Sequence, residues 1–302
     1  KDLNLSGNKL KTIDLSAYSN LYWLMLNAND LQTLDVSKNT TLGILSASGN
    51  QLKSVTLDNP AMWSLDLSTN YFEQISLDGA PNLEQVTLAH NYLSQLDVSK
   101  LTHLRALVLN NNFFTFNTLP LPKTSYTLYI YTNQSPVDAA LVDMTVDLSE
   151  HFEVNGDTTV YRWFIDVPTI NEVGELEGEE LVEGVEYTID NGVTTFLRSV
   201  GEVMCVMTNA TFPDLYQHTN LLDVTTGFDP VAADHAPASV VVRDRTIIVS
   251  TDDEAPVRLY NVNGMLLRTA AVAANGEVVL PNVASGVYVV MVGNRAYKAL
   301  VP

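Results

Sequence analysis

Apolar residues over roughly the first 120 positions occur in pairs separated by a single residue, and the pairs recur at intervals of 20 or 21 residues. This alternation predicts short strands whose alternate side chains point inward, with the strands of successive repeats paired as a parallel sheet. A coil of about 21 residues cannot bury its own leucines, so neighbouring coils must stack and share one core. The inward pairs are Leu3/Leu5, Leu24/Leu26, Leu45/Ala47, Leu65/Leu67, Val86/Leu88 and Leu107/Leu109.

A second set of apolar pairs has the same spacing and predicts the opposite wall of each coil: Ile13/Leu15, Leu34/Val36, Val55/Leu57, Ile75/Leu77 and Leu96/Val98. Too few residues separate the two walls for a long helix, so we expect extended or one-turn segments there. The residues inside these pairs indicate a solvated outer stripe rather than a metal site: Asp14, Asp35, Thr56, Ser76 and Asp97.

One asparagine stands at the same place in every repeat, between the two walls. The backbone must turn inside the solenoid there, and an asparagine side chain has the donor and the acceptor needed to satisfy buried backbone groups. We interpret this column as structural: Asn8, Asn29, Asn50, Asn70, Asn91 and Asn112. The frame L-x-L-x-x-N-x-L-x-x-L-x-L resembles the leucine-rich repeat family over roughly residues 1–120.

The repeat frame ends after Asn112, and residues 1–135 are predicted to form the repeat array with its C-terminal cap. The aromatic cluster 113–116 is expected to cover the exposed end of the core. Residues 126–131 predict one more strand, and residues 133–136 a linker.

Residues 136–237 are predicted to form a separate acidic domain. They hold 20 Asp and Glu against 2 Lys and Arg, so they carry almost all of the net charge of −19. Alternating strands that include Trp163 and Cys205 resemble an immunoglobulin-like β-sandwich without its first cysteine, which leaves Cys205 as a small core residue beside Trp163. The acidity argues against nucleic acid and anionic lipid as partners.

Seven glutamates crowd a segment with glycines: Glu172, Glu175, Glu177, Glu179, Glu180, Glu183 and Glu186. We expect a solvated acidic loop. Calcium binding is the alternative, but the spacing does not bring six or more oxygens onto one ion. No metal or cofactor is therefore predicted.

Residues 238–302 predict a hairpin with an Asn-Gly turn at Asn263-Gly264, a strand from Gly286 and a terminal strand ending near Val301. Together these resemble the type A C-terminal sorting domain of proteins that Bacteroidetes export through type IX secretion. The resemblance implies a compact β-sandwich that directs the protein to the outer-membrane surface. The end at Val301-Pro302, without a basic residue, departs from the pattern, and some such domains are kept as structural modules.

No apolar run reaches the roughly 18 residues of a membrane helix, and the chain opens inside a repeat, so we expect upstream coils and a signal peptide to be missing from it. Hydrolase, zinc-protease and phosphate-loop motifs are absent. The five histidines lack metal-ligand spacing, and most are expected on the surface.

The remaining candidate is the concave face of the array, where side chains between the inward leucines point outward. Exposed large apolar groups often mark contact patches, although they would equally cover the end of a shortened array. The candidate ligand-binding residues are Trp23, Met25, Ile44, Trp63, Asp66, Gln85, Thr87 and Val108.

The sequence thus predicts a mainly β protein, a leucine-rich repeat solenoid followed by two small β-sandwich domains. Its predicted function is non-enzymatic recognition or adhesion at the cell surface, resembling internalin-like adhesins, with a host or bacterial surface protein, a peptide or a glycan as partner. A non-catalytic carrier portion of a secreted enzyme and a structural stalk are the alternatives.

Overall fold

The computed structural model describes residues 1–171, 175–225, 238–243, 245–251, 256–261, 265–273, 276–292 and 295–301. The chain divides into two compact units, Lys1–Val224 and Thr225–Pro302. The boundary predicted at residues 135 and 136 lies inside the first unit. Among the described residues the regular structure is β-strand, apart from the single 3-10 turn η1 (Ser149–His151).

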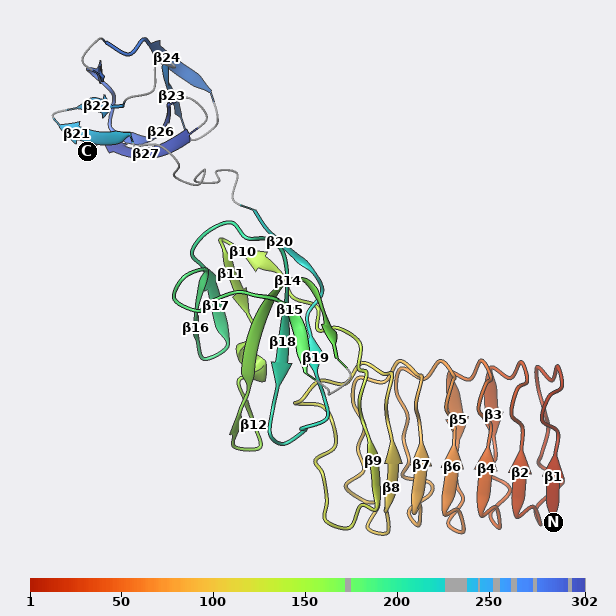
Figure 1. Cartoon of the computed structure of the whole chain (residues 1–302). Coiled ribbons are helices and arrows are strands. Elements are labelled where there is room, and N and C mark those ends of the chain that lie inside the picture. The colour runs from red at the N-terminus through yellow and green to blue at the C-terminus, as the bar shows by residue number, and fades with distance from the viewer. Residues whose placement is uncertain are drawn as a thin grey trace. The chain divides into compact units, whose positions relative to one another are not determined.

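The repeat array forms a parallel sheet of seven strands, side by side in chain order (Figure 1). Leu24 aligns with Leu3 on one side and Leu45 on the other, so the inward leucines of successive coils stack in columns, as the sequence predicts. Most of them are fully buried. The strands are β1 (Asp2–Asn4), β2 (Trp23–Met25), β4 (Ile44–Ser46), β6 (Ser64–Asp66), β7 (Gln85–Thr87), β8 (Ala106–Val108) and β9 (Leu128–Ile130).

The second wall is less regular. Only β3 (Thr33–Asp35) and β5 (Ser54–Thr56) pair there, in parallel, and no helix intervenes between the walls of the array. Asp14, Asp35 and Asp97 lie on the exposed outer stripe, and each accepts the backbone N–H of the serine two residues later at 2.8–2.9 Å. Hydrogen bonds from these serines lower the pKa of the three carboxyl groups.

The asparagine column links each coil to the one before it. Nδ2 of Asn50 donates to the carbonyl of Ala47 in its own coil (3.1 Å) and to that of Leu26 in the preceding coil (2.9 Å). Its Oδ1 accepts the backbone N–H of Leu31 (3.1 Å). Asn29, Asn70, Asn91 and Asn112 repeat this pattern and are buried, whereas Asn8 is exposed. These hydrogen bonds are of the kind that the structural interpretation of the column expects.

The column continues with a residue that the sequence analysis placed in a linker. Nε2 of Gln134 donates to the carbonyls of Leu109 (3.0 Å) and Tyr131 (2.8 Å), and its Oε1 accepts the N–H of Phe114 (3.1 Å). The linker prediction for residues 133–136 is therefore wrong at Gln134, because this longer amide takes the asparagine's place in the last coil.

A second amide pair lies on the other side of the coils. Asn39 and Asn59 are fully buried. Nδ2 of Asn59 donates to the carbonyls of Val36 and Asn39 at 2.9 Å each, and Nδ2 of Asn39 donates to that of Leu15 at 3.1 Å. This pair was not predicted, although the two asparagines stand one coil apart.

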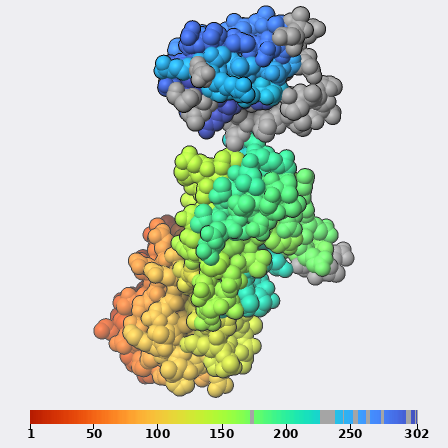
Figure 2. All heavy atoms as spheres, turned by 90° about the vertical axis from the view of Figure 1, so that its left-hand side faces the viewer, coloured from red at the N-terminus to blue at the C-terminus, as the bar shows by residue number. Residues whose placement is uncertain are grey.

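The array ends against the middle module (residues 136–224), as Figure 2 shows. The two share one hydrophobic core. The strand predicted at residues 126–131 is present as β9, the last strand of the array sheet. Phe116 stacks on Phe212 of the middle module with ring centroids 6.3 Å apart, and Tyr131 meets the same ring edge-on at 5.4 Å. Phe114 and Phe116 are buried as a cap requires, but Phe113 is 45% exposed and points away from the core.

The middle module has two larger sheets. One has the order β10 (Leu141–Val142), β11 (Thr145–Asp147), β17 (Val193–Phe196), β16 (Tyr187–Asp190). The other has the order β15 (Leu176–Glu180), β14 (Val160–Ile170), β18 (Gly201–Thr208), β19 (Gln217–His218), and β20 (Leu222–Val224) also pairs with β18. A small hairpin joins β12 (Glu153–Val154) to β13 (Asp157–Thr158).

The core of the middle module is built around a tryptophan. Trp163 and Cys205 are paired across β14 and β18 and are both fully buried, as predicted. The indole Nε1 donates to Oγ1 of Thr194 at 3.1 Å, and the ring meets Phe196 edge-on at 4.9 Å. Because Thr194 and Phe196 lie on β17, the indole joins the two sheets.

The predicted acidic loop is wrong for residues 176–180, which form β15 at the edge of a sheet. Glu180 forms a two-pronged ion pair with Arg162 (2.8 and 2.6 Å), and Glu186 is buried beside Arg198 (2.5 Å). Exposed charges on an edge strand discourage pairing with another chain, so these glutamates suit a strand. Glu172 lies outside the described residues.

The second unit contains two antiparallel sheets around its own core. The first has the order β21 (Ser239–Arg243), β22 (Thr246–Ser250), β25 (Glu277–Leu280), and the second β24 (Leu266–Ala270), β23 (Val257–Asn261), β26 (Gly286–Val292), β27 (Arg295–Val301). The predicted hairpin is present as the β23–β24 pair. Its Asn263-Gly264 turn and the C-terminal Pro302 lie outside the described residues.

Candidate binding face of the repeat array

The outward side chains of the parallel sheet form two rows, because each three-residue strand turns its middle residue toward the core and its two flanking residues toward the outer face. The first row is Asp2, Trp23, Ile44, Ser64, Gln85, Ala106 and Leu128. The second row is Asn4, Met25, Ser46, Asp66, Thr87, Val108 and Ile130. The strand register therefore places seven of the eight predicted residues on one face.

Apolar side chains gather at the β2 and β4 end of these rows. Trp23 is 40% exposed and lies opposite Ile44 on the adjacent strand, while Met25 occupies the second row of the same strand. Ile44 and Met25 are half-buried. We call these three side chains on two adjacent strands the tryptophan patch.

The eighth predicted residue, Trp63, lies one position before β6 and borders the same patch. Its Nε1 donates to the hydroxyl of Tyr22 at 3.4 Å, across the intervening Gly43. A Cβ at position 43 would lie 2.7 Å from Cε2 of Tyr22 and 3.3 Å from Nε1 of Trp63. A glycine is therefore required for the two aromatic side chains to meet over this strand.

The middle of the face is polar, and its side chains form hydrogen bonds with one another. Oδ1 of Asp66 accepts the backbone N–H (3.0 Å) and the hydroxyl (2.7 Å) of Ser68, and its Oδ2 accepts the hydroxyl of Ser46 (3.3 Å). The hydroxyl of Ser46 also lies 2.8 Å from Oδ1 of Asn27. The predicted ligand residue Asp66 is thus held by its own protein, and its carboxylate has a fixed orientation.

A second apolar area lies at the other end of the face, and only part of it was predicted. Val108 was predicted, but Leu128 (45% exposed) and Ile130 (37% exposed) on β9 were not. A separate hollow of about 230 Å³ is lined by Thr132 and Asn133, which follow β9, and by residues of the middle module, including Val167 and Ile170.

The predicted residues share a face but do not converge on one point. Four strand steps separate β2 from β8, which is about 19 Å at roughly 4.8 Å per step, and the seven strands span about 29 Å. Such a surface is suited to contacting an extended partner rather than to enclosing a small molecule.

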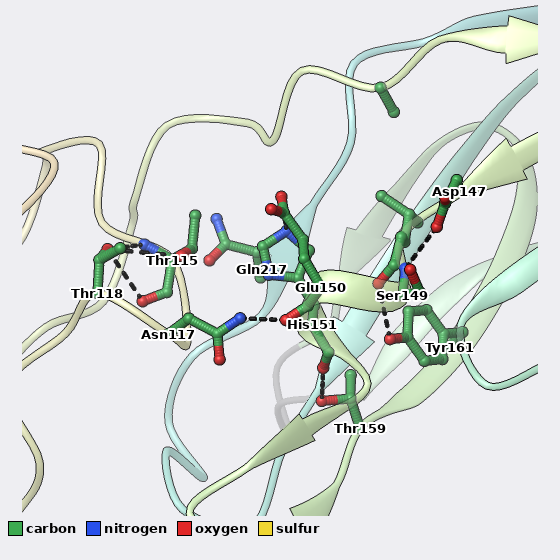
Figure 3. A network of polar contacts seen from close by, with 12 residues as sticks. Thr115, Asn117, Thr118, Asp147, Ser149, Glu150, His151, Thr159, Tyr161 and Gln217 are labelled. Carbon is green, nitrogen blue, oxygen red and sulfur yellow. Dashed lines mark hydrogen bonds and ion pairs between the residues drawn. The ribbon is translucent and has the colours of Figure 1, made fainter.

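The junction between array and middle module carries a polar network (Figure 3). Nδ2 of Asn117 donates to the carbonyl of Glu150, and the Thr159 hydroxyl donates to the carbonyl of His151 (2.5 Å). The His151 side chain is buried, whereas His90 and His103 are exposed, as expected of most histidines in the chain. Its Nε2 lies 3.1 Å from Oε1 of Glu150 without hydrogen-bond geometry. Burial lowers the pKa of His151, and the neighbouring Glu150 opposes that shift.

Within the described part of the chain, no three histidine, cysteine, aspartate or glutamate side chains come together as a metal site. Desolvation raises the pKa of the buried Cys205 thiol, which keeps it protonated and unreactive. Among the same residues, no helix is long and apolar enough to span a membrane.

Two solved structures resemble parts of the chain. One is a leucine-rich repeat protein of Leptospira interrogans, with 27% identity and a TM-score of 0.38 over 40% of this chain and 33% of that one. The other is the functional domain of InlJ from Listeria monocytogenes, which includes a cysteine ladder, with 19% identity and a TM-score of 0.45 over 72% of this chain and 52% of that one. The chain thus matches about a third of the first protein's length and about half of the second's. No protein-family model and no curated protein matches the chain.

Proposed function

We propose that this chain is a recognition protein without catalytic activity of its own, and that the concave face of its repeat array binds an extended segment of a partner protein. The observation that carries this proposal is a pair of exposed apolar areas on the same face of the sheet. One contains Trp23 on β2 and the other Leu128 on β9, and the strand register places both residues in the first row. Exposed apolar side chains in a connected patch are the usual anchors of a protein contact.

The size of the face supports a peptide-like partner. A standard protein interface buries about 800 Å² on each partner, whereas a sheet face about 29 Å long and about 10 Å wide, from three residues per strand, offers only about 300 Å². An extended segment of about nine residues, at about 3.3 Å per residue, would span the seven strands. The polar middle, with its fixed Asp66 carboxylate, would select among such segments.

The proposed location is the outside of a bacterial cell. The resemblance of residues 238–302 to type IX sorting domains supports export to the outer-membrane surface by that machinery. The alternative that the chain is the non-catalytic carrier portion of a secreted enzyme shares this location, and the full-length reading frame distinguishes the two.

The test is selection of a random twelve-residue peptide display library on the immobilised full chain. We expect enriched peptides with apolar residues near both ends, and loss of their binding in a Trp23→Ser/Met25→Ser variant. Tyr18→Ser is the matched control, because Tyr18 is 55% exposed but lies outside the two rows.

Equal enrichment on the wild type and on the Trp23→Ser/Met25→Ser variant would refute the concave-face proposal and favour a structural stalk. Selective retention of a glycan by the wild-type face, with no peptide enrichment, would replace the polypeptide partner by a carbohydrate.

A further inference from the structure

Three aromatic rings form an exposed stack along the array, away from the two rows of the sheet. Tyr71, Tyr92 and Phe113 each follow the column asparagine of their coil. The ring centroids of Tyr71 and Tyr92 lie 6.0 Å apart, and those of Tyr92 and Phe113 lie 5.8 Å apart with their planes inclined by 21°. The three residues are 45%, 48% and 45% exposed. The array therefore presents ring surface to solvent at intervals of one coil.

The stack borders a groove with hydrogen-bonding walls. A hollow of about 570 Å³ is lined by Tyr92 and Phe113 together with Glu73, Gln74, Ser94 and Gln95. Gln74 and Gln95 also line a larger hollow of about 820 Å³ on the second wall of the array. Because the two hollows share these amides, they lie next to each other, and we call them together the groove.

The groove combines an apolar floor with polar edges. Half-buried Val55, Ile75 and Leu96, one from each of three successive coils, line the larger hollow, which ends at Asn117 and Thr118. The charged residues lining the groove are Glu73, Asp97 and Lys53. With both signs present and a net charge near zero, the groove offers little attraction for a polyanion, and the net charge of −19 of the whole chain repels one.

We propose that this groove binds a neutral polysaccharide. A pyranose ring presents a C–H face that packs on an aromatic ring, and its hydroxyl groups both donate to and accept from amides and carboxylates. The rings of Tyr92 and Phe113 supply the platform, and Gln74 and Gln95 supply amide groups in the same repeat register. The rings and amides recur once per coil, so successive sugars of a polymer can contact equivalent groups along the array. The groove lies on the second wall, so this activity is independent of the proposed peptide contact on the sheet.

The test is affinity electrophoresis of the full chain through native gels containing a soluble β-glucan, α-glucan, mannan or xylan. We expect at least one of these neutral polymers to slow the wild-type protein and heparin not to slow it. Tyr92→Ala/Phe113→Ala is expected to weaken the apparent affinity about 10-fold or more, because the stacking surface is lost. Gln95→Ala, an exposed amide whose removal leaves the core intact, is expected to weaken the affinity without changing the unfolding midpoint.

Tyr18→Ala and Trp23→Ser are the controls, and both are expected to migrate as the wild type does. The proposal is overturned if none of the four neutral polymers slows the wild type, or if the Tyr92, Phe113 and Gln95 variants bind as well as the wild type. It is also overturned if Trp23→Ser abolishes the retardation, because the sugar site would then lie on the sheet.

Discussion

Replacing Gln134 by leucine tests whether the last coil depends on the amide column. The leucine side chain has a similar volume but neither a donor nor an acceptor. In the wild type, the Gln134 amide satisfies the N–H of Phe114 and the carbonyl of Tyr131 at the boundary with the middle module. We expect Gln134→Leu to destabilise the whole first unit, since the array and the middle module share one core.

The magnitude follows from the groups that lose a partner. The carbonyl of Leu109 keeps the Nδ2 of Asn112 at 3.0 Å, which leaves the Phe114 N–H and the Tyr131 carbonyl. Each unpaired buried group costs about 1–3 kcal/mol, so we expect a loss of about 3 kcal/mol. At a denaturant dependence of about 3 kcal/mol per molar urea, the midpoint falls by about 1 M.

The assay is urea unfolding of the full chain followed by tryptophan fluorescence, which reports Trp23 and Trp63 in the array and Trp163 in the middle module. Asn8→Leu is the matched control. Asn8 has the same place in its coil and donates to the carbonyl of Leu5, but it is exposed, so water replaces its hydrogen bonds. The control is expected to cost less than about 1 kcal/mol. Equal midpoints for the two variants would refute the argument that burial makes the Gln134 amide necessary.

Two further predictions concern buried titratable groups. Burial holds the pKa of His151 below 6.5, so the folded state favours the neutral imidazole. The contribution of His151 to folding stability is therefore fully present above about pH 6.5. It is lost as the pH falls through the lower pKa of the folded state. Unfolding free energies measured from pH 7 to pH 5 should therefore decline less steeply for His151→Gln than for the wild type, and parallel declines would contradict this. Cys205 is fully buried with a raised pKa, so the native protein should resist a disulfide-exchange thiol reagent at pH 8 and react on unfolding in urea. Labelling of the native protein within seconds would disprove that burial.

The periodic part of the fold was predictable because its signal is repeated. Each inward leucine, such as Leu45, has equivalents one coil before and one coil after it, so one misleading position does not obscure the pattern. Gln134 escaped prediction for the opposite reason. It follows Asn112 by 22 residues, after a stretch without the repeat frame, and its residue type differs from that of the other column positions.

Residues 176–180 were mispredicted because their strand depends on a distant partner. Glutamate and glycine have low intrinsic strand propensity, so the local sequence indicates a loop. Pairing of Glu180 with Phe164 and the ion pair from Glu180 to Arg162 stabilise a strand that local preference does not predict.

The sequence predicts which side chains of the candidate face point outward, because strand alternation determines this. Alternation places Trp23 and Met25 outside the core, but it does not say which outward residues remain exposed once the middle module packs. Leu128 and Ile130 were missed because β9 follows a break in the repeat frame. Phe113 was assigned to the cap because the sequence does not distinguish it from its neighbours Phe114 and Phe116, whereas the structure gives it a place in the exposed aromatic stack.

The amide column also has a consequence for how such an array changes in length. Every buried column residue donates hydrogen bonds to its own coil and to the preceding one through equivalent atoms. A complete coil inserted by gene duplication would therefore form the same hydrogen bonds with its neighbours. A deletion of half a coil would instead misalign both walls. Gain or loss of whole coils can therefore change the width of the sheet in steps of about 4.8 Å. The contacts between the last coil and the middle module would stay unchanged.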